Sequence, residues 1–265
     1  MKEKTMTDRY RNILFDREDP IATVTMNRPE RRNALSLEHL EELLACFRAI
    51  GADRDVRVAV LRGNGPAFSA GHDLSEMIDR DADFYQRLFG ICAEVMQTIQ
   101  SIPQPVIAEV HAMATAAGCQ LVASCDLAVA SSEARFATPG VKIGLFCTTP
   151  MVALTRAIGA RKAMEMLLTG EPISASEALG AGLVNRVVPP AELREATRTL
   201  ADRIIASSPY VVGLGKKAFY RQIRQPQAEA YAYASEVMCA NAAAEDAQEG
   251  MKAFLEKRKP AWGQR

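Results

Sequence analysis

The sequence has no excess of charge of either sign. Its 265 residues include 32 Lys and Arg against 32 Asp and Glu, so the formal net charge is zero. A protein that holds nucleic acid or an anionic membrane surface needs a basic field, which this composition does not supply. We therefore expect neither nucleic acid nor a membrane as a partner, and any phosphate-bearing ligand needs a local basic site.

Long hydrophobic runs are also missing. No stretch reaches the roughly 18 uncharged apolar residues of a membrane span, and the most apolar region, residues 106–125, is interrupted by Glu109, His111 and Gln120. Residues 1–9 contain acids and no apolar run, so they resemble neither a secretory signal nor a transit peptide. The simplest prediction is a cytosolic protein.

Several chemical motifs are absent as well. The six cysteines have no C-x-x-C spacing, which predicts reduced core residues and no metal site. No G-x-G-x-x-G follows the first strand, and no G-x-x-x-x-G-K-[ST] occurs. These absences exclude a Rossmann-type nucleotide enzyme and a phosphate-loop enzyme.

Hydrophobic periodicity predicts strands alternating with helices in the first 150 residues. The expected strands are 12–16, 21–26, 55–62, 105–110 and 126–130, and the expected helices begin at Ser36 or cover 84–100 and 116–124. Such alternation is typical of an α/β domain with crossover connections.

Helical patterns dominate after Pro150, apart from a strand at 183–188. We expect one long last helix over about 227–257, because no Gly or Pro interrupts this stretch before Gly250. We predict a core over residues 1–200 and a C-terminal helical region over 201–265.

Two segments of small residues follow predicted strands, at 67–74 and 111–120. Small side chains let a ligand lie against the backbone, and free N–H groups at a helix start can donate to a developing negative charge. Tight packing of a helix on a sheet favours the same residue types, so either segment alone leaves both interpretations open.

The order and spacing of the motifs resemble the crotonase (enoyl-CoA hydratase/isomerase) superfamily over nearly the whole chain. Residues 116–120 and 144–150 are similar to one branch of it in particular. The matching segments are 26–36 (MNRPERRNALS), 67–74 (AFSAGHDL), 105–108 (PVIA), 117–128 (AGCQLVASCDLA), 136–139 (FATP), 168–184 (LTGEPISASEALGAGLV) and 249–259 (EGMKAFLEKRK).

The resemblance implies a crotonase-type spiral of ββα repeats, with a helical C-terminal region that forms a homotrimer or a hexamer built as a dimer of trimers. It implies an acyl-CoA or enoyl-CoA thioester as ligand and no permanently bound cofactor, since coenzyme A is part of the substrate. Carried over by position, the backbone N–H groups of His72 and Ala117 form the oxyanion hole that stabilises a thioester enolate.

This sequence departs from the hydratase pattern at both acid–base positions. The two glutamates of a hydratase correspond to Gln120 and Gly140. Gln does not exchange a proton near neutral pH and Gly has no side chain, so we expect poor hydration. Replacing both by glutamate is expected to restore it, provided that the loop at 145–150 leaves room for a water.

Other groups near the expected site have competing interpretations. The His72 side chain has a suitable ordinary pKa for a general base, but it can also point away. Asp73 fits a helix cap better than a catalytic role. Cys119 and Cys147 fit inert packing. The enzyme hypothesis therefore stands beside a non-catalytic acyl-CoA binder, and only turnover separates them.

The resemblance also implies a set of residues for the CoA portion. A neutral protein needs local cations for the phosphates, although the basic tail also fits a solvated helix end. The implied residues are Arg31, Arg32, Ala34, Ser69, Ala70, Asp73 and Leu74, with Phe254 and Lys257 from the tail of the same or a neighbouring subunit.

Overall fold

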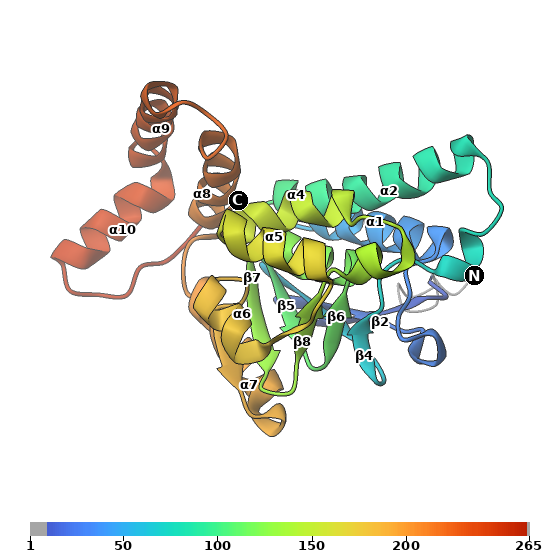
Figure 1. Ribbon diagram of the computed structural model, residues 1–265. Coiled ribbons are helices and arrows are strands. Elements are labelled where there is room, and N and C mark those ends of the chain that lie inside the picture. Colours follow the sequence, from blue (N-terminus) through green and yellow to red (C-terminus); the bar gives the residue numbers. More distant parts are fainter. Residues whose placement is uncertain (1–9, 264–265) are drawn as a thin grey trace.

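Two β-sheets wrapped by helices form the protein, as seen in the computed structural model, which describes residues 10–263 (Figure 1). The larger sheet has the strand order β1-β2-β3-β5-β7-β10, and the smaller sheet has the order β4-β6-β8-β9. The strands are β1 (Ile13–Glu18), β2 (Ile21–Met26), β3 (Val58–Gly63), β4 (Ala67–Ser69), β5 (Val106–Val110), β6 (Met113–Thr115), β7 (Leu127–Ser131), β8 (Arg135–Ala137), β9 (Ile173–Ser174) and β10 (Arg186–Val188).

The chain visits the two sheets in turn, which produces a spiral. β3 joins the large sheet, β4 joins the small one and a helix follows; β5 with β6, and β7 with β8, repeat this order. The helices are α1 (Leu37–Ala52), α2 (Ala82–Ser101), α3 (Ala117–Ser124), α4 (Thr148–Ala157), α5 (Ala160–Thr169), α6 (Ala175–Ala181), α7 (Leu193–Ile205), α8 (Pro209–Gln222), α9 (Gln227–Ala242) and α10 (Glu245–Leu255).

Local sequence signals explain most element starts. Ser36 caps α1 by accepting a hydrogen bond from the His39 N–H, as its position before the first apolar stripe predicts. The predicted hairpin is present as the antiparallel pair β1–β2, whereas β2, β3, β5 and β7 pair in parallel. The strands of the small sheet were not predicted, because with two or three residues each they are too short to show alternation.

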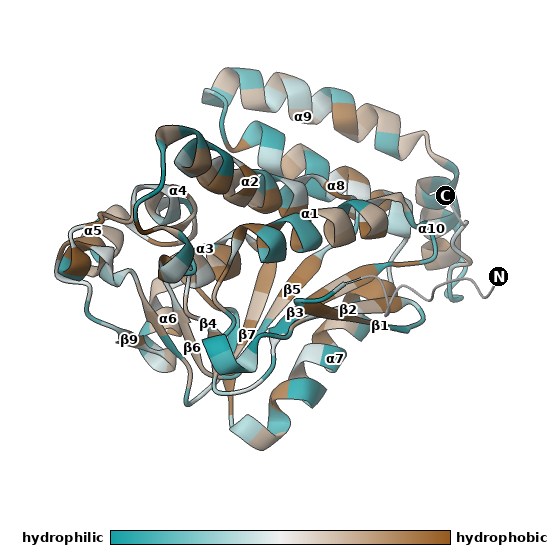
Figure 2. Cartoon of the chain, turned by 90° about the vertical axis from the view of Figure 1, so that its right-hand side faces the viewer, coloured by the Kyte–Doolittle hydropathy of each residue, from teal (hydrophilic) through white to brown (hydrophobic). Residues whose placement is uncertain are grey.

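The large sheet is covered on both faces. α1, α2 and α3 pack on one face around fully buried side chains such as Phe47 and Leu61, and α7 packs on the other through Leu193 and Ala201. Figure 2 shows these strands as the apolar layer between α1 and α7. Burial on both faces explains why the parallel strands are nearly continuous hydrophobic runs.

The C-terminal helices project from the core (Figure 1), and neither α8 nor α9 contains a fully buried residue. The prediction of one helix over 227–257 is wrong, since α9 ends at Ala242 and α10 begins at Glu245. The break lies in a run of alanines, where Ala244 takes an extended conformation that its residue type does not signal. The predicted division at residue 200 falls inside α7 and stays a prediction.

A buried ion pair fastens α8 to the core. Lys216 Nζ lies 2.6 Å from Asp126 Oδ2, and the two side chains are only 6% and 13% exposed. The ammonium also donates to the carbonyl oxygens of Ile99 and Gln104, each at 2.8 Å. Burial lowers the pKa of Lys216 and raises that of Asp126, and each partner partly counters the effect on the other.

Nothing in the described part of the chain has the form of a membrane-spanning helix: over residues 10–263, no helix is both long enough and apolar enough to cross a bilayer.

We predict that Lys216→Met lowers the free energy of unfolding by about 3–5 kcal/mol, because it leaves the Asp126 carboxylate buried without its partner. The neighbouring exposed residue provides the matched control: Lys217→Met should change stability by less than about 0.5 kcal/mol. Urea unfolding followed by circular dichroism measures both. Equal effects of the two substitutions would show that the ion pair does not hold α8 in place.

Candidate active site

A cavity of about 390 Å³ lies where the two small-residue segments meet. Its walls come from Ala70, His72 and Leu74 after β4, from Phe89 of α2, from residues 115–117 at the junction of β6 and α3, and from residues 139–150. The two sites singled out from the sequence therefore form one cavity. Both segments follow neighbouring parallel strands, β4 and β6, and so end at the same edge of the small sheet.

Gly71 brings the two segments into contact. A Cβ atom on this residue would lie 3.2 Å from the Ala117 nitrogen and 3.0 Å from the Thr115 carbonyl oxygen. Its φ of +83° also favours glycine. The backbone of residues 71 and 72 therefore runs directly beside the first turn of α3.

Neither of the two amides predicted to form the oxyanion hole has a hydrogen-bond acceptor among the described residues. The segments of Leu35 and His72 pair through two backbone hydrogen bonds, whose donors are the Leu35 and Asp73 N–H groups, so the His72 N–H takes no part in the pairing. Ala117 is the first residue of α3, where N–H groups have no intrahelical acceptor, and no side chain caps this helix. Both residues line the cavity.

Ala116 carries backbone strain next to these donors. Its angles, φ 50° and ψ −119°, are those of the first central residue of a type II′ turn, a position that Gly dominates. The next residue, Ala117, is helical and carries no such strain. The residue in the left-handed region is Ala116, and its N–H donates to the Ala137 carbonyl at 2.9 Å.

His72 is one of the residues that line the cavity. Its ring meets Phe89 edge-on, with centroids 5.2 Å apart, and Nε2 is buried with no hydrogen-bond partner among the described residues. Burial lowers the pKa of His72 to about 4. The imidazole is therefore neutral near pH 7 and is a weak base.

Gln120, at the first glutamate position, is buried in α3 and does not line the cavity. Its Oε1 atom lies 4.0 Å from the Cys92 thiol of α2, at the limit of a weak S–H hydrogen bond. The side chain therefore faces the contact between α2 and α3. Sequence position alone could not show this, because it does not specify the side chain's direction.

Gly140, at the second glutamate position, lines the cavity but has no room for any side chain. A Cβ atom there would lie 1.9 Å from the Leu145 carbonyl oxygen and 2.9 Å from Cys147 Sγ. The Leu145 N–H also donates to the Gly140 carbonyl at 2.9 Å, so the loop is tied down over this residue. The expectation that a glutamate here would restore hydration is therefore contradicted by the packing.

Titratable groups in the cavity are few. Among the described lining residues only His72, Lys142 and Cys147 titrate, and no carboxylate is present. Lys142 pairs with Glu171 at 2.6 Å. Burial raises the pKa of Cys147, and it raises that of the neighbouring Cys119 to about 12, which agrees with inert packing for both thiols.

The residues implied for the CoA portion divide into two groups in this structure. Ser69, Ala70, Asp73 and Leu74 lie around the start of the cavity, and Ala70 is hydrogen-bonded through its N–H to the carbonyl of Arg32 at 2.9 Å. Arg32 belongs to this same group through that contact. Arg31 and the buried Ala34 lie within two residues of it in the chain.

Several of these residues also have a structural role. The Ser69 hydroxyl donates to the Asn33 carbonyl at 2.9 Å. Asp73 caps the following short helix through the Ser75 N–H and pairs with Arg28 at 3.1 Å. Burial alone raises the pKa of Asp73, but the hydrogen bonds from Ser75 and Arg28 outweigh it, so the net pKa is lowered.

Phe254 and Lys257 do not join this group within one chain. They lie at the end of α10, which packs against α8 and α9, and Phe254 is 83% exposed. Figures 1 and 2 both show α10 far from α4, whose first residues line the cavity. Within one chain, Phe254 and Lys257 therefore lie away from the cavity.

Sequence reasoning missed some of the cavity wall. Thr115 lines it, and its hydroxyl is buried without a partner among residues 10–263. Phe89 and Ile143 supply apolar surface from α2 and from the segment after β8. Thr115 belongs to the small-residue segment and could have been found there, but nothing in the sequence marks Phe89. Within the same described residues, no group of three or more His, Cys, Asp or Glu is placed to hold a metal ion.

Comparison with known proteins gives consistent matches. A family model described as enoyl-CoA hydratase/isomerase matches residues 16–265. A relative from Mus musculus, "Enoyl-CoA hydratase domain-containing protein 3, mitochondrial", is 49% identical over 246 residues, which make up 92% of this chain and 82% of the relative. The crystal structure of human enoyl coenzyme A hydratase domain-containing protein 3 has a TM-score of 0.93 and 48% identity, covering 95% of this chain and 100% of that one. That of an enoyl-CoA hydratase from Mycobacterium smegmatis has a TM-score of 0.93 and 49% identity, covering 95% and 99%.

These matches confirm the crotonase-type α/β fold and the superfamily branch indicated by residues 116–120 and 144–150. They contradict the predicted cytosolic compartment, because the mouse relative is named as mitochondrial. The cytosolic prediction is therefore wrong. It rested on the composition of residues 1–9, which lie outside the described residues, and composition at one end of a chain does not fix its compartment.

We predict that Ala116→Gly raises the free energy of unfolding by about 1 kcal/mol. Strain at a residue held in such a sparsely populated region costs about 1–3 kcal/mol, which glycine relieves. Glycine also makes the unfolded chain more flexible, and this offsets about 0.4–1 kcal/mol of the gain. The same replacement inside α3, Ala123→Gly, should instead destabilise by about 1 kcal/mol. Opposite signs in urea unfolding support the strain, and destabilisation by both variants contradicts it.

Proposed function

Because the chain belongs to the enoyl-CoA hydratase/isomerase family, we propose that its cavity binds the acyl end of a CoA thioester. The thioester oxygen accepts hydrogen bonds from the His72 and Ala117 N–H groups, which polarise the carbonyl and stabilise an enolate. A donor aimed at such an oxyanion contributes about 3 kcal/mol. The observation that carries this proposal is the contact at Gly71, which leaves both N–H groups free at one end of an otherwise apolar cavity.

In our proposal the protein is not an efficient hydratase. Hydration needs a proton acceptor and a proton donor on one water, and no described lining residue is a carboxylate. His72 can accept a proton at Nε2, but a pKa near 4 makes it a weak base. Enolate chemistry that needs a strong base is therefore slow in this cavity.

The closed environment of Gly140 also favours the second candidate function, a non-catalytic acyl-CoA binder. The Leu145 carbonyl occupies the place where the acid–base side chain would begin. A protein that had merely lost a glutamate by substitution would have space left over. Here the loop fills that space, which suits a bound thioester that is held and not turned over.

The CoA portion, in this proposal, lies over the exposed Arg31 and Arg32 and the backbone of Ser69 and Ala70. Phe254 and Lys257 of a neighbouring subunit complete the site, because within one chain they lie at its other end. This arrangement requires a homo-oligomer, and we propose a trimer or a hexamer built from two trimers. The exposed apolar side chains of α9 and α10, among them Tyr231 and Leu255, provide the surface for it.

Calorimetry tests the binding. We expect butyryl-CoA to bind and butyrate not to bind, because most polar contacts are to the CoA portion. Arg31→Ala with Arg32→Ala should weaken butyryl-CoA binding about tenfold, as expected for lost hydrogen bonds from charged groups. The exposed Arg194→Ala serves as control and should leave affinity unchanged. Equal affinity for the ester and the free acid would falsify the proposal.

Hydration of crotonyl-CoA tests the reaction. We expect a rate roughly 10⁴-fold below that of a relative bearing both glutamates, since each proton-transfer group contributes about 10²–10⁴-fold. Gln120→Glu with Gly140→Glu should not raise it, because a side chain at 140 must displace the Leu145 carbonyl. Circular dichroism checks that the double variant is folded. Hydration by the unchanged protein at the relative's rate, or rescue by the two glutamates, contradicts the proposal.

A further inference from the structure

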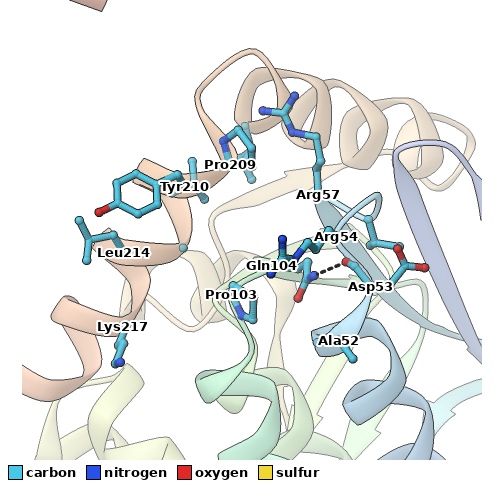
Figure 3. A pocket seen from close by; sticks show the side chains of 15 residues that line it. Ala52, Asp53, Arg54, Arg57, Pro103, Gln104, Pro209, Tyr210, Leu214 and Lys217 are labelled. Carbon is cyan, nitrogen blue, oxygen red and sulfur yellow. Dashed lines mark hydrogen bonds between the residues drawn. The ribbon is translucent and has the colours of Figure 1, made fainter. Parts of the chain in front are cut away.

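A second cavity, of about 700 Å³, lies between the end of α1 and the first half of α8 (Figure 3). We call it the α1–α8 cavity. It is walled by residues 51–57, by Pro103 and Gln104, by Ile204, and by residues of α8 between Pro209 and Lys217. It shares no lining residue with the acyl cavity, so the proposed thioester site does not account for it.

The lining of the α1–α8 cavity is positively charged. Arg54, Arg57 and Lys217 contribute three cations, and none of them forms an ion pair within the described part of the chain. The one acid in the lining, Asp53, is engaged by Arg17 at 2.6 Å. The three cations outnumber the one acid in the lining, and Asp246 attracts the Arg57 charge from outside it.

One nitrogen of the Arg57 guanidinium has no hydrogen-bond acceptor among the described residues. One of its terminal nitrogens donates to the Ser207 carbonyl, while Nε is buried and has no partner among the described residues. Asp246, the acid whose charge acts on Arg57, already accepts hydrogen bonds from the Ser208 hydroxyl and the Gly263 N–H. A buried guanidinium nitrogen without a partner is costly, and an anion removes that cost.

The side-chain oxygen of Gln104 accepts no hydrogen bond among the described residues. The residue is only 6% exposed, and its Nε2 donates to the Asp53 carbonyl at 2.8 Å, the bond drawn in Figure 3. That bond fixes which end of the amide carries oxygen, and Oε1 is left buried without a partner.

The remaining wall is apolar. Pro103, Pro209, Val212 and Leu214 contribute most of it, and α8 approaches Pro103 closely because residue 213 is glycine: a Cβ there would lie 3.0 Å from Pro103 Cβ. Apolar walls with a few unpaired polar groups, in a volume of several hundred Å³, are typical of small-molecule sites.

We propose that the α1–α8 cavity binds an organic phosphate of about nucleotide size. The phosphate lies between Arg54 and Arg57, whose planar guanidinium groups match its oxygens. An amino or hydroxyl group of the ligand donates to Gln104 Oε1, and its remaining body packs on the prolines. Arg54, Arg57 and Gln104 thereby gain partners.

Calorimetry of the full-length protein with AMP tests this, with adenosine and inorganic phosphate as partial probes. We expect AMP to bind and adenosine to bind at least tenfold more weakly, since it lacks the charge. Arg54→Glu should weaken AMP binding by about 10–100-fold, the range for a lost charged hydrogen bond. Arg57→Lys, which keeps the charge but removes Nε, should weaken it less.

Two controls locate the site. Arg161→Glu makes the same charge change at another exposed arginine and should leave AMP affinity unchanged. Saturating butyryl-CoA should not displace AMP. Loss of AMP binding on adding butyryl-CoA, or in Arg31→Ala with Arg32→Ala but not in Arg54→Glu, overturns the inference by placing AMP in the thioester site. A change in molecular mass of Arg54→Glu by light scattering also overturns it, since the cations would then serve a subunit contact.

Discussion

The contact between Gly71 and the start of α3 is the constraint on which the site depends. Because residue 71 has no side chain, the end of the strand can pass directly beside the Ala117 nitrogen. A Cβ atom at residue 71 would lie 3.2 Å from that nitrogen. In the function that we propose, the His72 and Ala117 N–H groups are the two donors to the thioester, and both residues line one cavity. The fold maintains this arrangement even though Ala116, next to it, is held in a conformation that glycine tolerates far better.

Two features leave the cavity without the acid and base of a hydratase: the residue types at positions 120 and 140, and the packing around them. Gly140 and Leu145 are in backbone contact, and Gln120 is turned toward α2. A single substitution toward glutamate cannot reverse either feature, because the loop and the helix contact must move as well. The donors that we propose for the thioester are backbone N–H groups and need no side chain. In the proposed function, binding and polarisation of a thioester are therefore separable from proton transfer.

Much of the fold could be predicted from the sequence, because long buried strands and capped helices have strong local signals: β3 and α2 lie close to their predicted ranges. The break between α9 and α10 could not be predicted, since Ala243 and Ala244 are good helix formers and tertiary context ends the helix there. For the site, the motifs located residues that line the cavity, among them His72 and Ala117, whose role as donors stays a prediction. They could not show that Gly140 is closed off, because this depends on a carbonyl five residues away folding back.

The C-terminal helices project from the core and expose apolar surface that the proposed assembly covers. α8 is fixed to the core by the buried Lys216–Asp126 pair, so the helices that follow it leave the core in a set direction. α9 buries no residue, and isolated helices of its length are marginal in water. In a closed symmetric assembly each chain gives and receives the same surface. The projection that takes Phe254 away from its own cavity is therefore what carries it to a neighbour's in the trimer that we propose.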